Sequence, residues 1–218
     1  SDLEDRLATA EKELLTLGEQ LSQVRQRAAH ELAKRVHQQL AELYMAKADF
    51  EVHFAKRTGT TKFTPTGIDD VEFYIQTNPG ESMGPLAKIA SGGELSRVML
   101  ALKTIFAANE GVTSIIFDEV DTGVSGRVAQ AIADKIRLIA AHSQVLCITH
   151  LPQVAAVAQH HFLIKKGVHG ERTTTTVTSL ATDQRVNELA RMLSGEKVTK
   201  LTKEHAQELL QMAHPEDK

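Results

Sequence analysis

Several residue types that would point to particular kinds of protein are scarce in this chain. Its 218 residues contain no Trp, 2 Tyr, 7 Phe and a single Cys. One cysteine excludes a disulfide within the chain, and the few aromatic rings provide no evident platform for stacking nucleic-acid bases. The formal net charge of −3 gives no broad basic field. Composition alone therefore does not predict nucleic-acid binding.

Long hydrophobic runs are also missing. No stretch approaches the roughly 20 apolar residues that span a membrane, and residues 1–5 lack the basic and apolar regions of a signal peptide. The lone Cys147 lies in an apolar run, as expected for a buried free thiol in a reducing compartment. We expect a cytoplasmic, nucleoid-associated protein with no membrane partner. Because the chain does not begin with Met, we also expect it to be a fragment.

The first 48 residues have the hydrophobic spacing of a coiled coil. Apolar residues recur in alternating steps of four and three at Leu3, Leu7, Ala10, Leu14, Leu17, Leu21, Val24 and Ala28. From Ala28 to Leu40 every step is four, which loosens the supercoil. We predict a coiled-coil arm over residues 1–48 that needs a partner helix. The alternative is a long amphipathic helix lying on its own domain.

Residues 49–218 have the pattern of one α/β lobe. Residues 50–54 and 71–75 alternate as an antiparallel strand pair would, and residues 94–108 have helical spacing. Apolar strands then alternate with helices, which predicts a mostly parallel sheet flanked by helices. Its strands are expected at 114–117, 145–149 and 161–165, with helices at 125–141 and 153–159. A strand at 173–178 and helices at 183–193 and 198–212 complete the prediction.

The segment Ser91-Gly92-Gly93-Glu94 begins a predicted helix. Ser followed three residues later by Glu is a capping box, which could simply start that helix. A capping box does not require two glycines, however, and glycine allows a backbone to approach a ligand closely. Free amides at a helix N-terminus bind anions. We therefore favour phosphate binding by Ser91, Gly92, Gly93 and Glu94.

Two carboxylates, Asp118 and Glu119, follow an apolar strand. The carboxyl end of a parallel strand is where open α/β sheets bind ligands. Asp118 is placed to hold a magnesium ion and Glu119 to polarise the water that attacks a terminal phosphate. Acidic residues at a strand end are often inert, so the pair alone is weak evidence.

A second group of polar residues strengthens this interpretation. Asp121 and Ser125 lie in a glycine-punctuated loop after the carboxylates, and Ser125 is also a candidate helix cap. His150 follows the next strand, so it should lie near Asp118 and Glu119 and contact a terminal phosphate. A lone His is more often an ordinary surface residue. His160 and His161 have no acidic or sulfur partner at metal-ligand spacing, which argues against zinc.

Together these segments resemble the C-terminal half of an ATPase head from the SMC-like group of ABC proteins. In family order, SGGELSR resembles the signature motif, IIFDE the Walker B motif, VDTG the D-loop, and His150 the switch histidine. KIASGGELSRVMLALK, IFDEVDTGVSG and CITHLPQVAAVA are most similar to a branch of the group that repairs bacterial DNA double-strand breaks. The phosphate-binding Walker A loop and the Q-loop of the family are absent.

The resemblance implies a role for each matching residue. Ser91, Gly92 and Gly93 would reach the γ-phosphate of ATP held by a second head, and Asp121 would contact that second subunit. Asp118 would coordinate magnesium, Glu119 would orient water or act as the base, and His150 would sense the γ-phosphate. The implied partners are the N-terminal head lobe, a second head in an ATP-sandwiched homodimer, and DNA.

Three functions are open at this point. The first is an ATPase half-head whose dimerisation and hydrolysis move coiled-coil arms and tether broken DNA. It would be inactive without the N-terminal lobe that supplies Walker A. The second is an ATP-gated clamp in which hydrolysis is incidental. The third is the ATPase domain of an ABC transporter, which shares the signature and Walker B motifs but needs no heptad helix.

Overall fold

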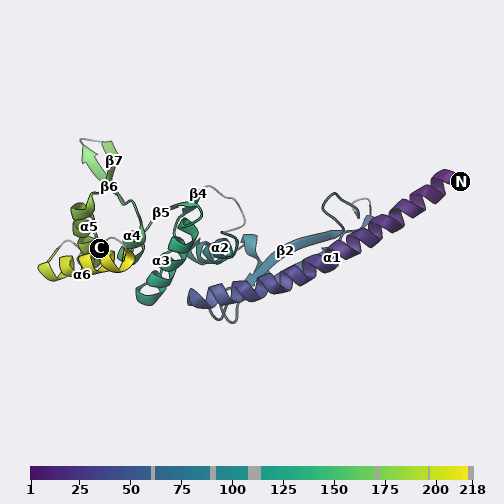
Figure 1. Cartoon of the computed structure of the whole chain (residues 1–218), viewed down its shortest axis with the longest axis horizontal. Helices are drawn as coiled ribbons and strands as arrows, with labels where there is room; N and C mark the ends of the chain where they lie inside the picture. Colours follow the sequence, from purple (N-terminus) through teal and green to yellow (C-terminus); the bar gives the residue numbers. More distant parts are fainter. Residues whose placement is uncertain (60–61, 89–91, 108–113, 170–171, 196, 216–218) are drawn as a thin grey trace. The chain divides into compact units, whose positions relative to one another are not determined.

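The structure is a computed structural model of the whole chain, and it describes residues 1–59, 62–88, 92–107, 114–169, 172–195 and 197–215 (Figure 1). The chain divides into two compact units, Ser1–Ile105 and Phe106–Lys218. Each unit is described by itself.

The first unit is built on one long helix, α1 (Asp2–Glu42). The helix ends before residue 48, the predicted end of the arm, because Tyr44 adopts a left-handed conformation with φ of 59°. The backbone N–H of Met45 closes the turn by donating to the carbonyl of Leu40 at 2.8 Å. The chain therefore reverses direction a few residues earlier than the periodicity indicates.

The predicted antiparallel strand pair is confirmed. Strand β1 (Asp49–Lys56) pairs with β2 (Asp69–Gln76) along their full length, and the short β3 (Gly84–Pro85) joins β2 on its other edge. The hairpin buries Phe50 and Ile75, and α1 buries Val36 and Leu40. Contacts between α1 and β1 join these surfaces, so the hairpin packs on the helix.

The arm is in contact with the rest of its unit for more of its length than the sequence predicts. Gly18 and Ser22 of α1 are buried, and Ser22 Oγ donates to Asp69 Oδ1 at 2.9 Å. A Cβ on Gly18 would lie 2.7 Å from Ile68 Cγ2, so only glycine allows this approach. A helix lying on its own domain, the alternative interpretation, therefore describes α1 from Gly18 onward. The large apolar residues of the heptad seam from Leu3 to Val24 remain exposed.

The first unit ends with the helix that carries the signature segment. A single 3₁₀ turn, η2 (Leu86–Lys88), precedes α2 (Gly92–Phe106). This is the helix predicted over residues 94–108, although Ala108 lies outside the described residues. Its buried side chains include Val98, Leu102 and Ile105.

The second unit begins with a parallel strand pair. Strands β4 (Ser114–Phe117) and β5 (Gln144–Cys147) pair in parallel, and α3 (Gly126–Ala140) connects them. One face of the pair is open, because Ile116 is 69% exposed and Leu146 and Ile148 are also exposed. Within the described residues, burial is found only on the other face, where Phe117 lies.

The α/β class is confirmed, but one strand differs from the prediction. Strand β6 (Phe162–His169), which includes the expected strand 161–165, pairs antiparallel with β7 (Arg172–Ser179) and does not join a parallel sheet. Only two residues separate β6 from β7, so pairing within this hairpin costs little loop-closure entropy. Apolar composition alone could not distinguish the two arrangements.

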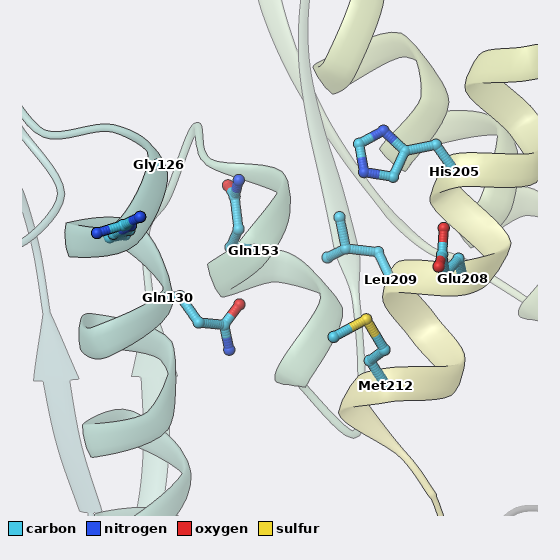
Figure 2. A pocket seen from close by; sticks show the side chains of 8 residues that line it. Gly126, Gln130, Gln153, His205, Glu208, Leu209 and Met212 are labelled. Carbon is cyan, nitrogen blue, oxygen red and sulfur yellow. The ribbon is translucent and has the colours of Figure 1, made fainter.

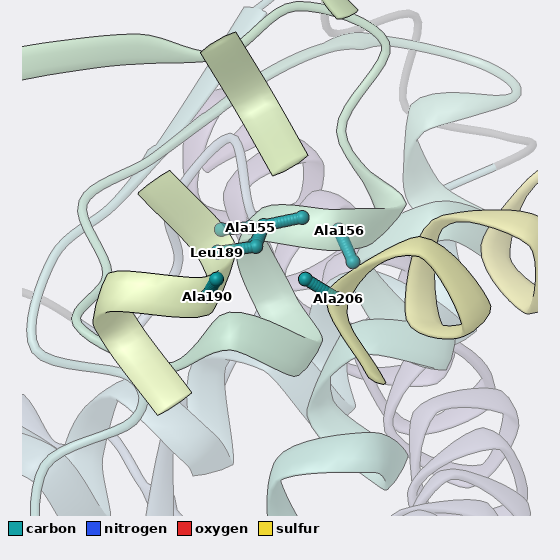
Figure 3. Packing of buried hydrophobic residues seen from close by; sticks show 5 residues of the cluster. All are labelled: Ala155, Ala156, Leu189, Ala190 and Ala206. Atoms are coloured by element: carbon teal, nitrogen blue, oxygen red, sulfur yellow. The ribbon is translucent and has the colours of Figure 1, made fainter. Parts of the chain in front are cut away.

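Three helices form the main packed cluster described in the second unit. They are α4 (Pro152–Val157), α5 (Thr182–Ser194) and α6 (Lys200–Ala213). Figure 3 shows the buried residues where these helices meet, four alanines whose small side chains allow close approach and one leucine: Ala155, Ala156, Ala190, Ala206 and Leu189. Arg185 of α5 donates to the carbonyl of Ala158 at 2.7 Å. The cluster thereby holds α4, the helix that follows the candidate switch histidine.

Candidate functional site

The ends of β4 and β5 lie side by side. Phe117 pairs with Cys147, and the backbone N–H of Ile148 donates to the carbonyl of Phe117 at 2.9 Å. Asp118 and Glu119 leave one strand at the edge where His150 leaves the other. The predicted convergence of these three residues on one sheet edge is present in the backbone. All three are exposed, as residues that contact a ligand must be.

Glu119 has an unusual backbone conformation. Its φ is 57°, in the left-handed region that residues other than glycine seldom adopt. Such a conformation costs about 1 to 3 kcal/mol and occurs often at functional sites. The strained backbone is held on both sides of Glu119, because Phe117 and Val120 are buried. The turn therefore directs Glu119 away from the strand while its neighbours anchor the backbone.

Asp121 is an anchor inside the chain. Its residue is 2% exposed, and its Oδ2 accepts a short hydrogen bond from Thr149 Oγ1 and a 3.1 Å bond from the backbone N–H of His150. The ring Nδ1 of His150 lies 3.4 Å from the same oxygen. The family resemblance implied that Asp121 contacts a second subunit. In this structure its carboxylate is occupied by the loop that carries the switch histidine.

Thr149 completes this arrangement, and sequence reasoning missed it. Its Oγ1 donates to Asp121 and accepts from the backbone N–H of Leu151 at 3.0 Å. Leu151 is the N-cap of α4, so one hydroxyl joins the loop after β4 to the start of that helix. The position of Thr149 directly before His150 was the available signal. The backbone of His150 is therefore held by the hydrogen bonds of its two neighbours, Thr149 and Leu151.

The signature segment lies in the other unit. Ser91 lies outside the described residues; Gly92 begins α2 and is exposed, whereas Gly93 is buried. Glu94 Oε2 accepts from Thr77 Oγ1 at 3.0 Å, and Glu94 Oε1 accepts from Asn78 Nδ2 at 3.2 Å. Both oxygens of Glu94 thus bond to the loop after β2. We did not anticipate a role for Thr77 or Asn78 from the sequence.

The carboxylates at this sheet edge suit a magnesium ion bound partly by water and phosphate better than a metal ion enclosed entirely by protein ligands. Among the described residues, no group of three His, Cys, Asp or Glu side chains could hold an ion. Magnesium is commonly held by one or two carboxylates together with waters and substrate phosphates. The exposed Asp118 at the strand end fits that mode. The oxygen chemistry of this edge is therefore compatible with the predicted ion.

Cys147, at the end of β5, borders the site but is a poor nucleophile. Burial, together with the negative charges of Asp121 and Asp118, raises the pKa of its thiol to about 12. Because the thiolate is the reactive form, the thiol is inert at neutral pH. The thiol is free, as predicted, but it is half-buried and not fully buried.

A pocket of about 440 Å³ opens elsewhere in the second unit, between α3, α4 and α6 (Figure 2). Its lining includes Gln130, Gln153 and His205 but none of the predicted site residues. The sheet edge, with its carboxylates and histidine, is therefore the better candidate for chemistry.

Comparison with known proteins gives a consistent set of relatives. No family model matches the chain. The DNA repair protein RecN of Halalkalibacterium halodurans is 57% identical over 212 residues, which is 97% of this chain and 38% of that protein. RecN of Bacillus subtilis is 50% identical over 223 residues, covering 97% of this chain and 39% of that protein. The chain spans less than two fifths of the length of either relative.

A solved structure extends the comparison to the fold. The Smc head domain with a coiled coil and joint from Pyrococcus yayanosii superposes with a TM-score of 0.58 at 19% identity. The match covers 88% of this chain and 35% of that one. The fold is therefore that of an SMC-type head, an α/β lobe with an N-terminal helix. Over the segment that it spans, the chain belongs to the RecN family. Among the described residues, no helix is long and apolar enough to cross a membrane.

Proposed function

We propose that this chain is the C-terminal half of an SMC-like ATPase head that acts in DNA double-strand-break repair. Binding of ATP would join two heads, and hydrolysis would separate them, so that coiled-coil arms tether broken DNA ends. The observation that carries the proposal is the edge of β4 and β5, where Asp118, Glu119 and His150 emerge together. A phosphate-activating site needs a metal-binding carboxylate, a water-orienting group and a phosphate sensor.

Each residue at the edge has a distinct role in this proposal. Asp118 would hold a magnesium ion, which when bound neutralises charge on the phosphates. Glu119 accepts a proton from, or orients, the attacking water. His150 donates a hydrogen bond to the terminal phosphate, and Asp121 fixes its loop. We therefore assign Asp121 a positioning role. Any contact with the second subunit would be made by the backbone next to Asp121.

The signature segment would complete the site of a second head. The N-terminus of α2, with Ser91, Gly92 and Gly93, would bind the γ-phosphate of that ATP through backbone amides and the serine hydroxyl. Glu94 is better suited to hold the helix in place than to bind phosphate, because its carboxylate is negative and bonded to Thr77 and Asn78.

The partner within the head would be the N-terminal lobe of the same protein. Apolar residues on one face of β4 and β5 are exposed, and so are Phe162, Ile164, Val168 and Val177 on one face of the β6–β7 hairpin. A two-stranded hairpin with an exposed apolar face is marginal alone. The N-terminal lobe would cover these faces and supply the phosphate loop that the described motifs lack.

The arm would pair with a helix from that same N-terminal half. Leu7, Leu14 and Leu21 belong to the exposed heptad seam, and an uncovered seam of this kind is stable only against another helix. The same seam argues against a transporter domain, because such a domain has no use for a protruding coiled coil.

ATP turnover by the chain alone and mixed with the N-terminal half tests the proposal. We expect turnover only in the mixture, and we expect Glu119→Gln to abolish it while stabilising ATP-dependent dimers. A folded mixture that binds ATP without turnover would favour the ATP-gated clamp. Turnover by the chain alone would refute the split head. Bridging of linear DNA by the mixture, compared with circular DNA, tests the repair role.

A further inference from the structure

Strand β2 contacts functional elements at both of its ends. The loop directly after its last residue, Gln76, bonds to the signature helix α2: Thr77 Oγ1 and Asn78 Nδ2 donate to the two oxygens of Glu94 at 3.0 and 3.2 Å. We call this group the signature-end contact. It holds the first turn of the helix whose N-terminus would bind phosphate.

The first residue of β2 bonds to the arm. Asp69 is buried and its Oδ1 accepts from Ser22 Oγ at 2.9 Å, while Arg25 Nη1 donates to the carbonyl of Thr66 at 2.7 Å. Close packing of Ile68 on Gly18 surrounds these bonds. We call the Ser22, Arg25, Thr66 and Asp69 group the arm-end contact. It holds α1 at Ser22 and Arg25, which lie along the arm and away from the turn that joins α1 to β1.

The strand between the two contacts is held straight. All eight residues of β2 pair with β1, and the hairpin lies along α1 (Figure 1). At about 3.4 Å per residue, the eight-residue strand spans roughly 24 Å. A fully paired strand resists bending and stretching better than a loop would. A displacement of α2 at one end therefore has a direct covalent and hydrogen-bonded route to α1 at the other.

We propose that β2 couples the signature helix to the coiled-coil arm, with Glu94 as the positioning residue at one end and Ser22 with Asp69 at the other. Phosphate binding at the start of α2 would pull on Thr77 and Asn78 through Glu94, and the strand would transmit that movement to the arm. The inference rests on the proposed function for its ligand, but the coupling itself exists without nucleotide.

Two alternatives to this coupling predict different contacts. Glu94 does not serve its own helix alone, because both of its carboxylate oxygens also accept hydrogen bonds from the loop after β2. If the arm were attached only through the α1–β1 turn, Ser22 would have no buried carboxylate partner. The two contacts are separate in sequence and joined by one element, so a double-mutant cycle can measure their interaction.

Hydrogen exchange on the nucleotide-free, full-length protein provides the first test. Glu94→Gln should raise exchange of the α1 amides near Ser22 by about 3-fold or more. Glu81→Gln is the matched control, because Glu81 accepts from the same Thr77 and Asn78, and so competes with Glu94 for the single hydroxyl proton of Thr77, but does not belong to α2. Unchanged exchange near Ser22 in Glu94→Gln, or an equal rise in Glu81→Gln, would overturn the coupling.

A distance measurement with nucleotide provides the second test. Spin labels at Glu11→Cys on the arm and Lys88→Cys before the signature should report a change on adding a non-hydrolysable ATP analogue. Ser22→Ala and Glu94→Gln should each remove most of that change, and the double variant should lose no more than either. Thr16→Ala is the arm control, because Thr16 bonds only to its own helix, at Lys12.

The two tests separate failure of the coupling from failure of the proposed function. No change in the unsubstituted protein would contradict ATP-driven movement, and the exchange result would still decide the coupling. A change that persists in full in Ser22→Ala and Glu94→Gln would overturn the coupling while leaving ATP binding intact.

Discussion

The two long hairpins of this chain have equal length and opposite environments. In both, strands of eight residues pair in antiparallel register over their whole length. The β1–β2 hairpin buries one end of its apolar face, where Phe50 is 1% exposed, whereas Val71 toward the other end is exposed. The β6–β7 hairpin has Ile164 at 57% exposed, and every described residue of β7 is exposed. The difference lies in what covers each hairpin, since α1 packs on the first.

This comparison shows that the pairing of two strands does not by itself determine whether their apolar side chains are buried. Both hairpins satisfy their backbone hydrogen bonds within the chain. Only the first also removes part of its apolar face from water, with Phe50 and Ile75 buried, and this burial is the larger stabilising effect. The second therefore depends on a surface that this segment does not supply, and we propose that the N-terminal lobe provides it.

The largest effect should come from removing a buried side chain of the β1–β2 hairpin. Phe50→Ala should lower the free energy of unfolding of the first unit by about 3 to 5 kcal/mol, because it leaves a cavity against Phe73 and α1. Ile164→Ala in the exposed hairpin should change stability by less than about 0.5 kcal/mol. Denaturant unfolding of both variants tests the contrast. Equal losses would mean that the two hairpins are equally covered.

A larger side chain on Gly18 should disrupt the attachment of the arm. Gly18→Leu should destabilise the first unit by about 1 to 3 kcal/mol, because its Cβ would overlap Ile68. Ala10→Leu, on the exposed part of α1, is the matched control and should be neutral. Thermal unfolding reports both. A neutral Gly18→Leu would show that α1 lies away from the hairpin in solution.

Removal of the buried carboxylate of Asp121 tests how the loop that carries His150 is anchored. Asp121→Ala should cost about 1 to 3 kcal/mol, because it leaves the Thr149 hydroxyl and the His150 N–H without an acceptor. Turnover by the reconstituted head should also fall, because the loop that carries His150 loses the carboxylate that holds it. Asp134→Ala, on the exposed surface of α3, is the control. Unchanged stability and turnover would contradict the anchoring role.

Relief of backbone strain at Glu119 should have the opposite sign. Glu119→Gly should raise stability by up to about 1 kcal/mol, because glycine adopts φ of 57° without penalty, while ATP turnover is lost. Glu119→Gln keeps the strain and should leave stability unchanged. Unfolding curves of the two variants, measured together, separate strain from charge. A destabilised Glu119→Gly would mean that the side chain itself supports the fold.

The smallest effect concerns the thiol at the end of β5. With its pKa raised to about 12, Cys147 should react slowly with a maleimide at pH 7.5 and faster as the pH rises. Asp118→Asn should accelerate the reaction slightly by removing a nearby negative charge. Reaction rates followed by mass spectrometry decide this. A rate equal to that of an exposed cysteine would contradict the burial.

Local pattern predicted most of the elements and the order of the site motifs. Helix α3, strand β4 and the β1–β2 pairing lie close to their predicted positions, because each has a strong hydrophobic period or a clear turn. The partners of the exposed strands could not be predicted, since an apolar run fits a parallel sheet, a hairpin and a covered face equally well. Thr77, Asn78 and Thr149 were missed because a hydroxyl or amide has no recognisable pattern until its partner is located.

By itself, the sequence determined the periodicity of the arm, the α/β class and the identities of the residues at the sheet edge. These follow from interactions between residues close in the chain, or from side-chain chemistry that no fold can alter. Only the tertiary structure decided that Asp121 holds His150, that Glu94 bonds to the end of β2 and that Ser22 bonds to Asp69. Each of these contacts joins segments far apart in sequence, and such pairings are selected by the packing of the whole unit.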